Sequence, residues 1–377
     1  MTDNNNQQPA STLTKVARSP GFWMLAWRRF RRRKLSMLAL AVVICLSAIA
    51  VFSPMIAGTK PIICKYKGGI YFPCLAYLNA DWENPIFHKD RFRKRYPENL
   101  REKDTDSWAI WPLVFQDPYR PVRDGEWQDK NADGEWVDRP GNPYFGGLPS
   151  KLNIFGTYKR GVDVFASMVH GTRIALLVGF VSTGIAAFIG ITLGAIAGYM
   201  GGAIDMVISR IIELVMCIPG IVLILALIAV IDKTNIWIMM AILGLTSWTG
   251  IARLTRAEFL KLKQSEFVAA AQSIGAGPLR IMFRHILPNA LAPVMVPIVF
   301  GIAAAIKVEA GLSLLGFGAP PPNPSWGTVL NAGTSNYTEW WQIVFPGIAI
   351  FITILAYNLI GEGVQEATDP RLADPKD

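Results

Sequence analysis

The chain has 377 residues, of which 51% are hydrophobic and only 17% carry charge. Soluble proteins carry about 25% charged residues, so this composition indicates a membrane protein. It excludes a disordered chain, and the presence of only four cysteines excludes a disulfide-built scaffold. The net charge of +9 would suit nucleic-acid binding, but its distribution along the chain argues against that function.

The positive charge is concentrated in residues 1–34, which hold eight basic residues and one acidic residue. The uncharged apolar run 35–56 follows this segment directly. A basic block beside an apolar run of that length is typical of a cytoplasmic flank and a membrane span. We therefore expect a cytoplasmic N-terminal segment over 1–34 and a first transmembrane helix over 35–56. We expect the partner of this basic block to be the lipid bilayer and not nucleic acid.

The N-terminal segment also has a helical apolar spacing. Trp23, Trp27 and Phe30 fall on one face of a helix, which predicts an interfacial helix within the segment. A cleavable signal peptide is the alternative, since Ala48-Ile49-Ala50 resembles a cleavage site. The long polar stretch before the apolar run favours an uncleaved anchor instead.

Uncharged runs predict five further membrane spans and thus six in all. They cover about 174–198, 206–231, 234–252, 286–306 and 340–361. Six spans place both termini on one side of the membrane. The basic loop 253–285 and the tail 363–377 then lie in the cytoplasm, in agreement with the positive-inside rule. The predicted fold class is an all-α integral membrane protein with a core over 174–362.

Residues 57–173 do not span the membrane and form a large extracytoplasmic insert between the first two helices. The insert holds five of the twelve tryptophans and dense charge of both signs. Patterning leaves its fold open. An oxidising compartment permits a disulfide between Cys64 and Cys74, which lie on either side of a Gly-Gly turn signal.

A second pattern in the insert has two interpretations. Asp129, Asn131 and Asp133, followed by a glycine, fit the first half of a calcium-binding loop. The twelfth position of that loop, which should be Glu, is Pro140. The alternative, which the missing ligand favours, is a β-hairpin that pairs residues 126–129 with 135–138.

No enzyme site is evident in the sequence. It contains no phosphate-binding Gly-rich loop with Lys and Ser or Thr, and its three histidines lack metal-ligand spacing. No Ser or Cys lies in a recognisable nucleophile motif. We expect no catalytic activity and no cofactor in this chain. Energy for any transport must then come from an ion gradient or from another polypeptide.

The loop 253–285 has the most informative pattern. Helix signals run to Ile274, and Gly275-Ala276-Gly277-Pro278 combines a helix stop with a helix start. The pattern predicts a helix–turn–helix whose second helix runs into the next span. Such a unit presents a compact surface to a partner at the membrane.

This loop resembles the coupling loop, or EAA loop, of permease subunits in binding-protein-dependent ABC importers. The family pattern is matched in register by Ala270, Ala271, Gly275, Leu287 and Pro288. Two positions depart from it, because Ala269 replaces its Glu and His285 replaces its Ile. The ending Arg-His-Ile-Leu-Pro-Asn is similar to the dipeptide/oligopeptide/nickel branch. The resemblance implies that the ATPase-coupling residues are Glu266, Ala270, Ala271, Gly275, Arg284, His285, Leu287 and Pro288.

The resemblance extends from Phe155 to the C-terminus and includes the N-terminal span. Its motif order resembles the OppC type, and Lys60-Pro61 with Tyr71-Phe72-Pro73 resembles the long-insert, Yej-like variant. It implies a type I ABC importer permease fold in the bacterial inner membrane. The implied partners are an OppB-type sister permease, two ATPase domains that bind ATP and magnesium, and an extracytoplasmic substrate-binding protein.

The implied substrates are peptides or peptide-like compounds, with nickel and oligosaccharides as alternatives within the branch. A gradient-driven secondary transporter is the alternative from another class. Such transporters commonly contain inverted repeats with paired broken helices, and the sequence shows no symmetry between its halves.

Overall fold

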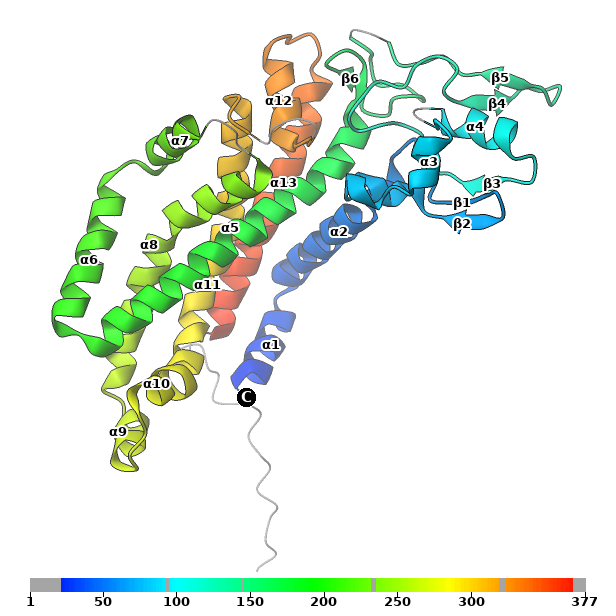
Figure 1. The fold of residues 1–377 in the computed structure, drawn as a ribbon. Coiled ribbons are helices and arrows are strands. Elements are labelled where there is room, and N and C mark those ends of the chain that lie inside the picture. Colours follow the sequence, from blue (N-terminus) through cyan, green and yellow to red (C-terminus); the bar gives the residue numbers. More distant parts are fainter. Residues whose placement is uncertain (1–21, 93–94, 144–145, 232–234, 319–322, 369–377) are drawn as a thin grey trace, which may run out of the picture.

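The computed structural model describes residues 22–92, 95–143, 146–231, 235–318 and 323–368. Figure 1 shows a bundle of long helices with a lobe of short helices and strands at one end. The remainder of the predicted N-terminal segment and of the predicted tail lies outside the described residues.

Five helices are long and apolar enough to cross a bilayer, and a bent helix pair is a sixth candidate. This confirms the helical membrane architecture expected from the sequence. The five are α2 (Lys34–Ile56), α5 (Val164–Met200), α8 (Ile236–Lys263), α11 (Leu287–Leu314) and α13 (Trp341–Thr368).

Helix α5 begins well before residue 174, where the sequence places the start of its span. The side chain of Asp163 caps the helix by accepting the backbone N–H of Ala166 at 2.7 Å. Arg173, the charge that suggested the boundary, lies within the helix and donates to the carbonyl oxygen of Leu78 in the insert at 3.2 Å. The first turns of α5 therefore belong to the junction with the insert.

The predicted span 206–231 is divided in two. Helices α6 (Gly202–Cys217) and α7 (Gly220–Val230) meet at 87°. Ile218 is extended and Pro219 has no N–H to donate, so an α-helix cannot continue through this point. The bent pair is either a broken span or a re-entrant segment.

Close packing of α5 against α8 depends on glycine. A Cβ on Gly190 would lie 2.8 Å from the carbonyl oxygen of Trp248, and one on Gly198 would lie 2.6 Å from that of Arg256. Such separations are below van der Waals contact. The small residues on α5 therefore let the two backbones approach closely, as is usual in membrane bundles.

The described N-terminal segment packs against the end of α13. In α1 (Phe22–Arg32), Ala26 and Phe30 are buried with Ala367. Arg33 forms ion pairs with Glu362 at 3.2 Å and Glu366 at 3.0 Å. The described ends of the chain thus lie at the same end of the bundle, away from the insert (Figure 1).

The insert contains short strands as well as helices, an addition to the all-α description of the membrane region. Its main sheet is antiparallel with the order β2-β1-β3. The elements are β1 (Ile63–Tyr66), β2 (Gly69–Tyr71), η1 (Pro73–Tyr77), η2 (Ala80–Trp82), α3 (Pro85–Lys89), α4 (Tyr96–Lys103), β3 (Trp108–Ile110), β4 (Gln128–Lys130), β5 (Trp136–Asp138), β6 (Thr157–Tyr158) and β7 (Val162–Asp163).

The insert has its own aromatic core and a polar attachment to the bundle. The buried rings of Tyr66, Phe87, Phe92 and Tyr96 form the centre of the core. At the attachment, Asp117 accepts hydrogen bonds from Thr59 and Tyr77, and His170 of α5 is hydrogen-bonded to the carbonyl oxygen of Ala57 at 2.8 Å. Because these groups are buried and mutually paired, they fix the insert to the N-terminal end of α5.

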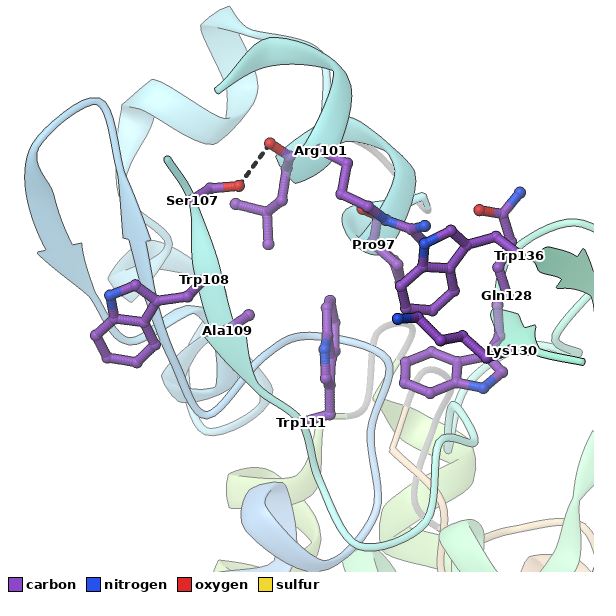
Figure 2. Close-up of a pocket in the computed structure, with 11 residues that line it drawn as sticks. Pro97, Arg101, Ser107, Trp108, Ala109, Trp111, Gln128, Lys130 and Trp136 are labelled. Carbon is purple, nitrogen blue, oxygen red and sulfur yellow. Dashed lines mark hydrogen bonds between the residues drawn. The ribbon is translucent and has the colours of Figure 1, made fainter. Parts of the chain in front are cut away.

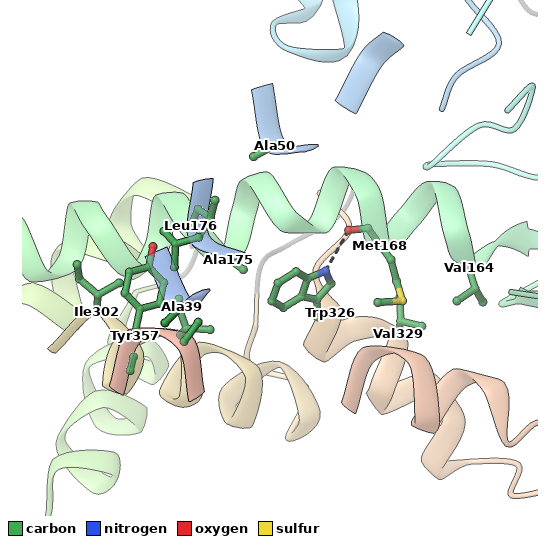
Figure 3. Packing of buried hydrophobic residues seen from close by; sticks show 14 of the residues in the cluster. Ala39, Ala50, Val164, Met168, Ala175, Leu176, Ile302, Trp326, Val329 and Tyr357 are labelled. Atoms are coloured by element: carbon green, nitrogen blue, oxygen red, sulfur yellow. Dashed lines mark hydrogen bonds between the residues drawn. The ribbon is translucent and has the colours of Figure 1, made fainter. Parts of the chain in front are cut away.

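Another short helix, α12 (Trp326–Thr334), lies at the same end of the bundle. The indole N–H of Trp326 donates to the carbonyl oxygen of Met168 in α5 at 3.0 Å. Figure 3 shows this bond beside the buried cluster that joins α2, α5, α11 and α13.

Candidate functional site

The loop between α8 and α11 forms a compact helical knob at one end of the bundle, which we call the coupling knob (residues 264–286). Helix α8 ends at Lys263, whose Nζ donates to the carbonyl oxygen of Tyr199 in α5 at 2.6 Å. The knob consists of α9 (Glu266–Ser273), α10 (Pro278–Arg280) and a π-helical turn (Ile281–Ile286) that leads into α11. Figure 1 places it at the end opposite the insert.

Gly275 forms the turn of the knob, as its sequence context predicts. It has φ of +79°, its N–H donates to the carbonyl of Gln272 at 2.9 Å, and the N–H of Ala276 donates to that of Ala271 at 3.0 Å. These two bonds make a Schellman motif, in which the residue after the helix must be left-handed. A Cβ at this position would meet no atom within 4 Å, so the requirement for glycine is conformational and not steric.

Ala270 and Ala271 have different surroundings, which their sequence pattern does not distinguish. Ala270 is exposed, whereas Ala271 is 4% exposed and packs with Val268, Ile281 and Met282. Of the two alanines, only Ala270 is exposed on the surface of the knob, and the role of both in ATPase coupling stays a prediction. The small size of Ala271 is required because it packs inside the knob.

The outer surface of the knob carries an apolar patch that the sequence reasoning missed. Ile274, Leu279 and Phe283 are 85%, 66% and 58% exposed. Large apolar side chains that cluster on an exposed surface mark an interaction site. The signal in the sequence is that Leu279 and Phe283 lie four residues apart, while Ile281 and Ile286 supply the buried face.

The other predicted coupling residues flank this patch. Glu266 is exposed in the first turn of α9, where a negative charge favours the helix dipole. Arg284 is exposed and His285 is half-buried within the π-helical turn. Leu287 and Pro288 begin α11, and because proline has no N–H, the carbonyl of Arg284 lacks its usual helical donor. The π-turn adjusts the backbone at this point.

A small cavity lies between α5, α7, α8 and α11, on the membrane side of the knob. Its volume is about 210 Å³, and the hydroxyls of Ser182, Thr183 and Ser247 interrupt an otherwise apolar lining. The Ser182 Oγ is buried and has no hydrogen-bond partner among the described residues. The bundle therefore contains a polar-lined space within its spanning segments.

The paired-strand interpretation of the insert motif is confirmed. Strand β4 pairs with β5, with Gln128 opposite Asp138 and Lys130 opposite Trp136. The Asn131 Oδ1 accepts the backbone N–H groups of Asp133 at 3.0 Å and Glu135 at 2.8 Å. Within the described residues, no group of three His, Cys, Asp or Glu side chains could hold a metal. Calcium binding by Asp129, Asn131 and Asp133 stays an untested prediction.

Cys64 and Cys74 are both buried, and the structure has both as free thiols. The Cys74 thiol donates to the carbonyl oxygen of Ile62 at 3.5 Å. Burial, with a smaller contribution from Cys74, raises the pKa of the Cys64 thiol to about 12. The disulfide between them stays a prediction.

Comparison with known proteins agrees with this arrangement. Residues 190–374 match the family of binding-protein-dependent transport system inner membrane components. Residues 21–66 match the N-terminal transmembrane domain of oligopeptide transport permease C.

Two relatives align over nearly the whole chain. The inner membrane ABC transporter permease protein YejE of Escherichia coli is 32% identical, over 92% of this chain and 96% of that protein. The peptidoglycan transport system permease protein YejE of Agrobacterium fabrum is 31% identical, over 97% of this chain and 98% of that protein. The oligopeptide transport system permease protein OppC of Bacillus subtilis is 36% identical, over 59% of this chain and 73% of that protein.

The helical knob, the membrane-type helical bundle and the family match thus agree on the same family. The chain belongs to the binding-protein-dependent transport system inner membrane components, and it is an inner-membrane permease of the OppC type.

Proposed function

We propose that this chain is one pore subunit of an ATP-driven importer for peptides or peptide-like compounds, including peptide-bearing fragments of peptidoglycan. The names of the relatives support this range of cargo. An OppB-type sister permease would complete the pore, and two ATPase domains would bind ATP and magnesium. An extracytoplasmic substrate-binding protein would deliver the cargo.

The observation that carries the proposal is the exposed apolar patch on the coupling knob. It projects from the same end of the bundle as the basic helix α1, whose charge favours a cytoplasmic location. This supports a topology with both termini in the cytoplasm and the insert outside. Closure of the ATPases on ATP would move the knob, and α8 and α11, which flank it, would transmit that movement to the bundle.

The experiment uses two equally exposed leucines. Leu279 on the knob is 66% exposed and Leu148 on the insert is 64% exposed. In the reconstituted complex, we expect Leu279→Glu to weaken ATPase association and to lower ATP-dependent uptake, because the charge enters an apolar contact. Leu148→Glu should leave both unchanged. Normal uptake by the Leu279→Glu complex with its ATPases bound would contradict the proposal.

A further inference from the structure

We propose that one face of the β2-β1-β3 sheet in the insert lies on the surface of the lipid bilayer, beside the end of α2. The partner of this face is the head-group region of the phospholipids. The contact holds the insert close to the membrane. This inference depends on the membrane-spanning helix α2 and not on the cargo or the ATPases of the proposed function.

The sheet has one buried face and one exposed face, because side chains alternate between the two faces along a strand. Cys64 and Tyr66 of β1 belong to the aromatic core of the insert, and Ala109 of β3 packs against it. Figure 2 shows Trp108 and Ala109 on opposite sides of β3. The strand register brings five residues together on the face opposite the core, namely Ile63, Lys65, Ile70, Trp108 and Ile110.

This outer face is mainly apolar. Ile70, Trp108 and Ile110 are each about half exposed or more, and Phe72, which follows β2, is also exposed. The insert has its own core on the other side of the sheet, so these side chains are not what holds it together. Large apolar side chains gathered on an exposed surface mark a contact with protein or membrane.

Backbone hydrogen bonds place the outer face at the membrane boundary. Helix α2 has 23 residues, a length of about 34 Å that just crosses a hydrocarbon layer of about 30 Å. The chain that leaves β3 returns to the end of this helix. The N–H of Leu113 donates to the carbonyl oxygen of Met55 at 3.3 Å, and that of Val114 donates to Ile56 at 2.9 Å. Leu113, which is 84% exposed, therefore lies beside the last turn of a membrane span.

The outer face is also on the side of the insert that is nearer the membrane. Figure 1 shows α3 and α4 above the sheet, and β1 and β2 along the lower side of the insert at the level of the end of α2. Because the core lies between the sheet and these helices, the outer face is the lower one. Through Leu113 and Met55 it continues into the exposed apolar surface of α2, which includes Phe52.

The residue types on the outer face suit a head-group region. Tryptophan is enriched at membrane–water interfaces, where its ring meets both apolar and polar surroundings. Lys65 lies between Ile70 and Trp108 in the register of the sheet. Its alkyl stem can stay beside these apolar side chains while its ammonium group pairs with lipid phosphates. A protein that covered the same face would exclude both lipid and water, which the experiment detects.

The experiment places a nitroxide spin label on the full-length chain in nanodiscs of phosphatidylethanolamine and phosphatidylglycerol. The labelled variants are Ile110→Cys and Leu113→Cys, and the matched control is Val137→Cys. Ile110 and Val137 are both β-branched strand residues, 51% and 49% exposed, but Val137 is on β5, at the upper side of the insert in Figure 1. The exposed native cysteines, Cys45 and Cys217, are replaced by Ala, and this background chain shows that the buried thiols stay unlabelled.

The measurement is the collision rate of each label with oxygen, which concentrates in hydrocarbon, and with a nickel chelate, which stays in water. We expect the ratio of oxygen to nickel collisions to be several-fold higher at residues 110 and 113 than at residue 137. An equal ratio at the three positions would show that the face is in water and would overturn the proposal. Low collision rates with both reagents at residues 110 and 113 would also overturn it, because they would show a protein contact. Neither result bears on the proposed pore function, since no ATPase or cargo is present.

Discussion

The coupling knob and the insert lie at opposite ends of the helical bundle, and they are stabilised differently. The knob has few residues, and its buried face, with Ala271 and Ile281, packs directly on the bundle through Phe259 of α8. The insert buries an aromatic cluster of its own and joins the bundle through paired polar groups such as Asp117. The comparison shows that the knob has no fold apart from the bundle, whereas the insert has a core independent of it.

The largest expected effect tests the independence of the insert. Phe87 is 2% exposed at the centre of its core, so Phe87→Ala should cost about 3–5 kcal/mol of unfolding free energy within the insert. Limited proteolysis of the full chain should show cleavage confined to the insert. Retained binding of the ATPases is the control. Simultaneous loss of ATPase binding would show that the two regions are coupled after all.

The next prediction concerns the two faces of α9. Ala271→Glu buries a charge without a partner and should destabilise the knob by on the order of 3 kcal/mol. Ala270→Glu places the same charge in solvent and should leave the fold unchanged. Hydrogen exchange over residues 264–286 distinguishes them. Equal protection in the two variants would mean that Ala271 is not part of the packed face.

A smaller effect is expected at the turn. Gly275→Val forces a β-branched residue to φ of +79° and should cost about 1–2 kcal/mol. Gly275→Asn is the matched variant, since asparagine tolerates the left-handed region. ATP-dependent uptake should therefore fall in the Val variant and be largely retained in the Asn variant. If both variants lose uptake to the same extent, the side chain and not the backbone is the cause.

The last prediction is a pH dependence at the junction of insert and bundle. Burial raises the pKa of Asp163 from 3.8 to about 7, although N–H groups of α5 oppose the shift. Its contribution to stability is thus complete below pH 3.8 and is lost as the pH rises through about 7. The melting temperature of the full chain should fall between pH 5 and pH 8. In Asp163→Asn, which keeps the helix cap, this fall should be smaller; an identical fall would assign it to another group.

Local sequence signals predicted the knob better than the insert. Gly275 and Pro278 encode a helix stop and start within four residues, and the structure has both. The burial of Ala271 could have been read from Val268, three residues earlier on the same face. Hydropathy alone missed the break at Pro219, because the residues on both sides are apolar.

The fold of the insert could not be predicted in this way, since its defining contacts are distant in sequence. Thr59 and Asp117 are hydrogen-bonded across 58 residues, and Cys64 of β1 pairs with Ala109 of β3. The β1–β2 and β4–β5 hairpins, whose strands are joined by short turns, could be recognised locally.

The attachment of Arg33 to the end of α13 has a consequence for biogenesis. Arg33 and Glu362 are 329 residues apart, so their ion pair cannot form until α13 has left the ribosome and entered the membrane. The pair itself is partly exposed and contributes little, but the apolar face of α1 packs at the same place. A chain that stalls before α13 therefore leaves Ala26 and Phe30 without Ala367, the residue of α13 that is buried with them in the finished chain.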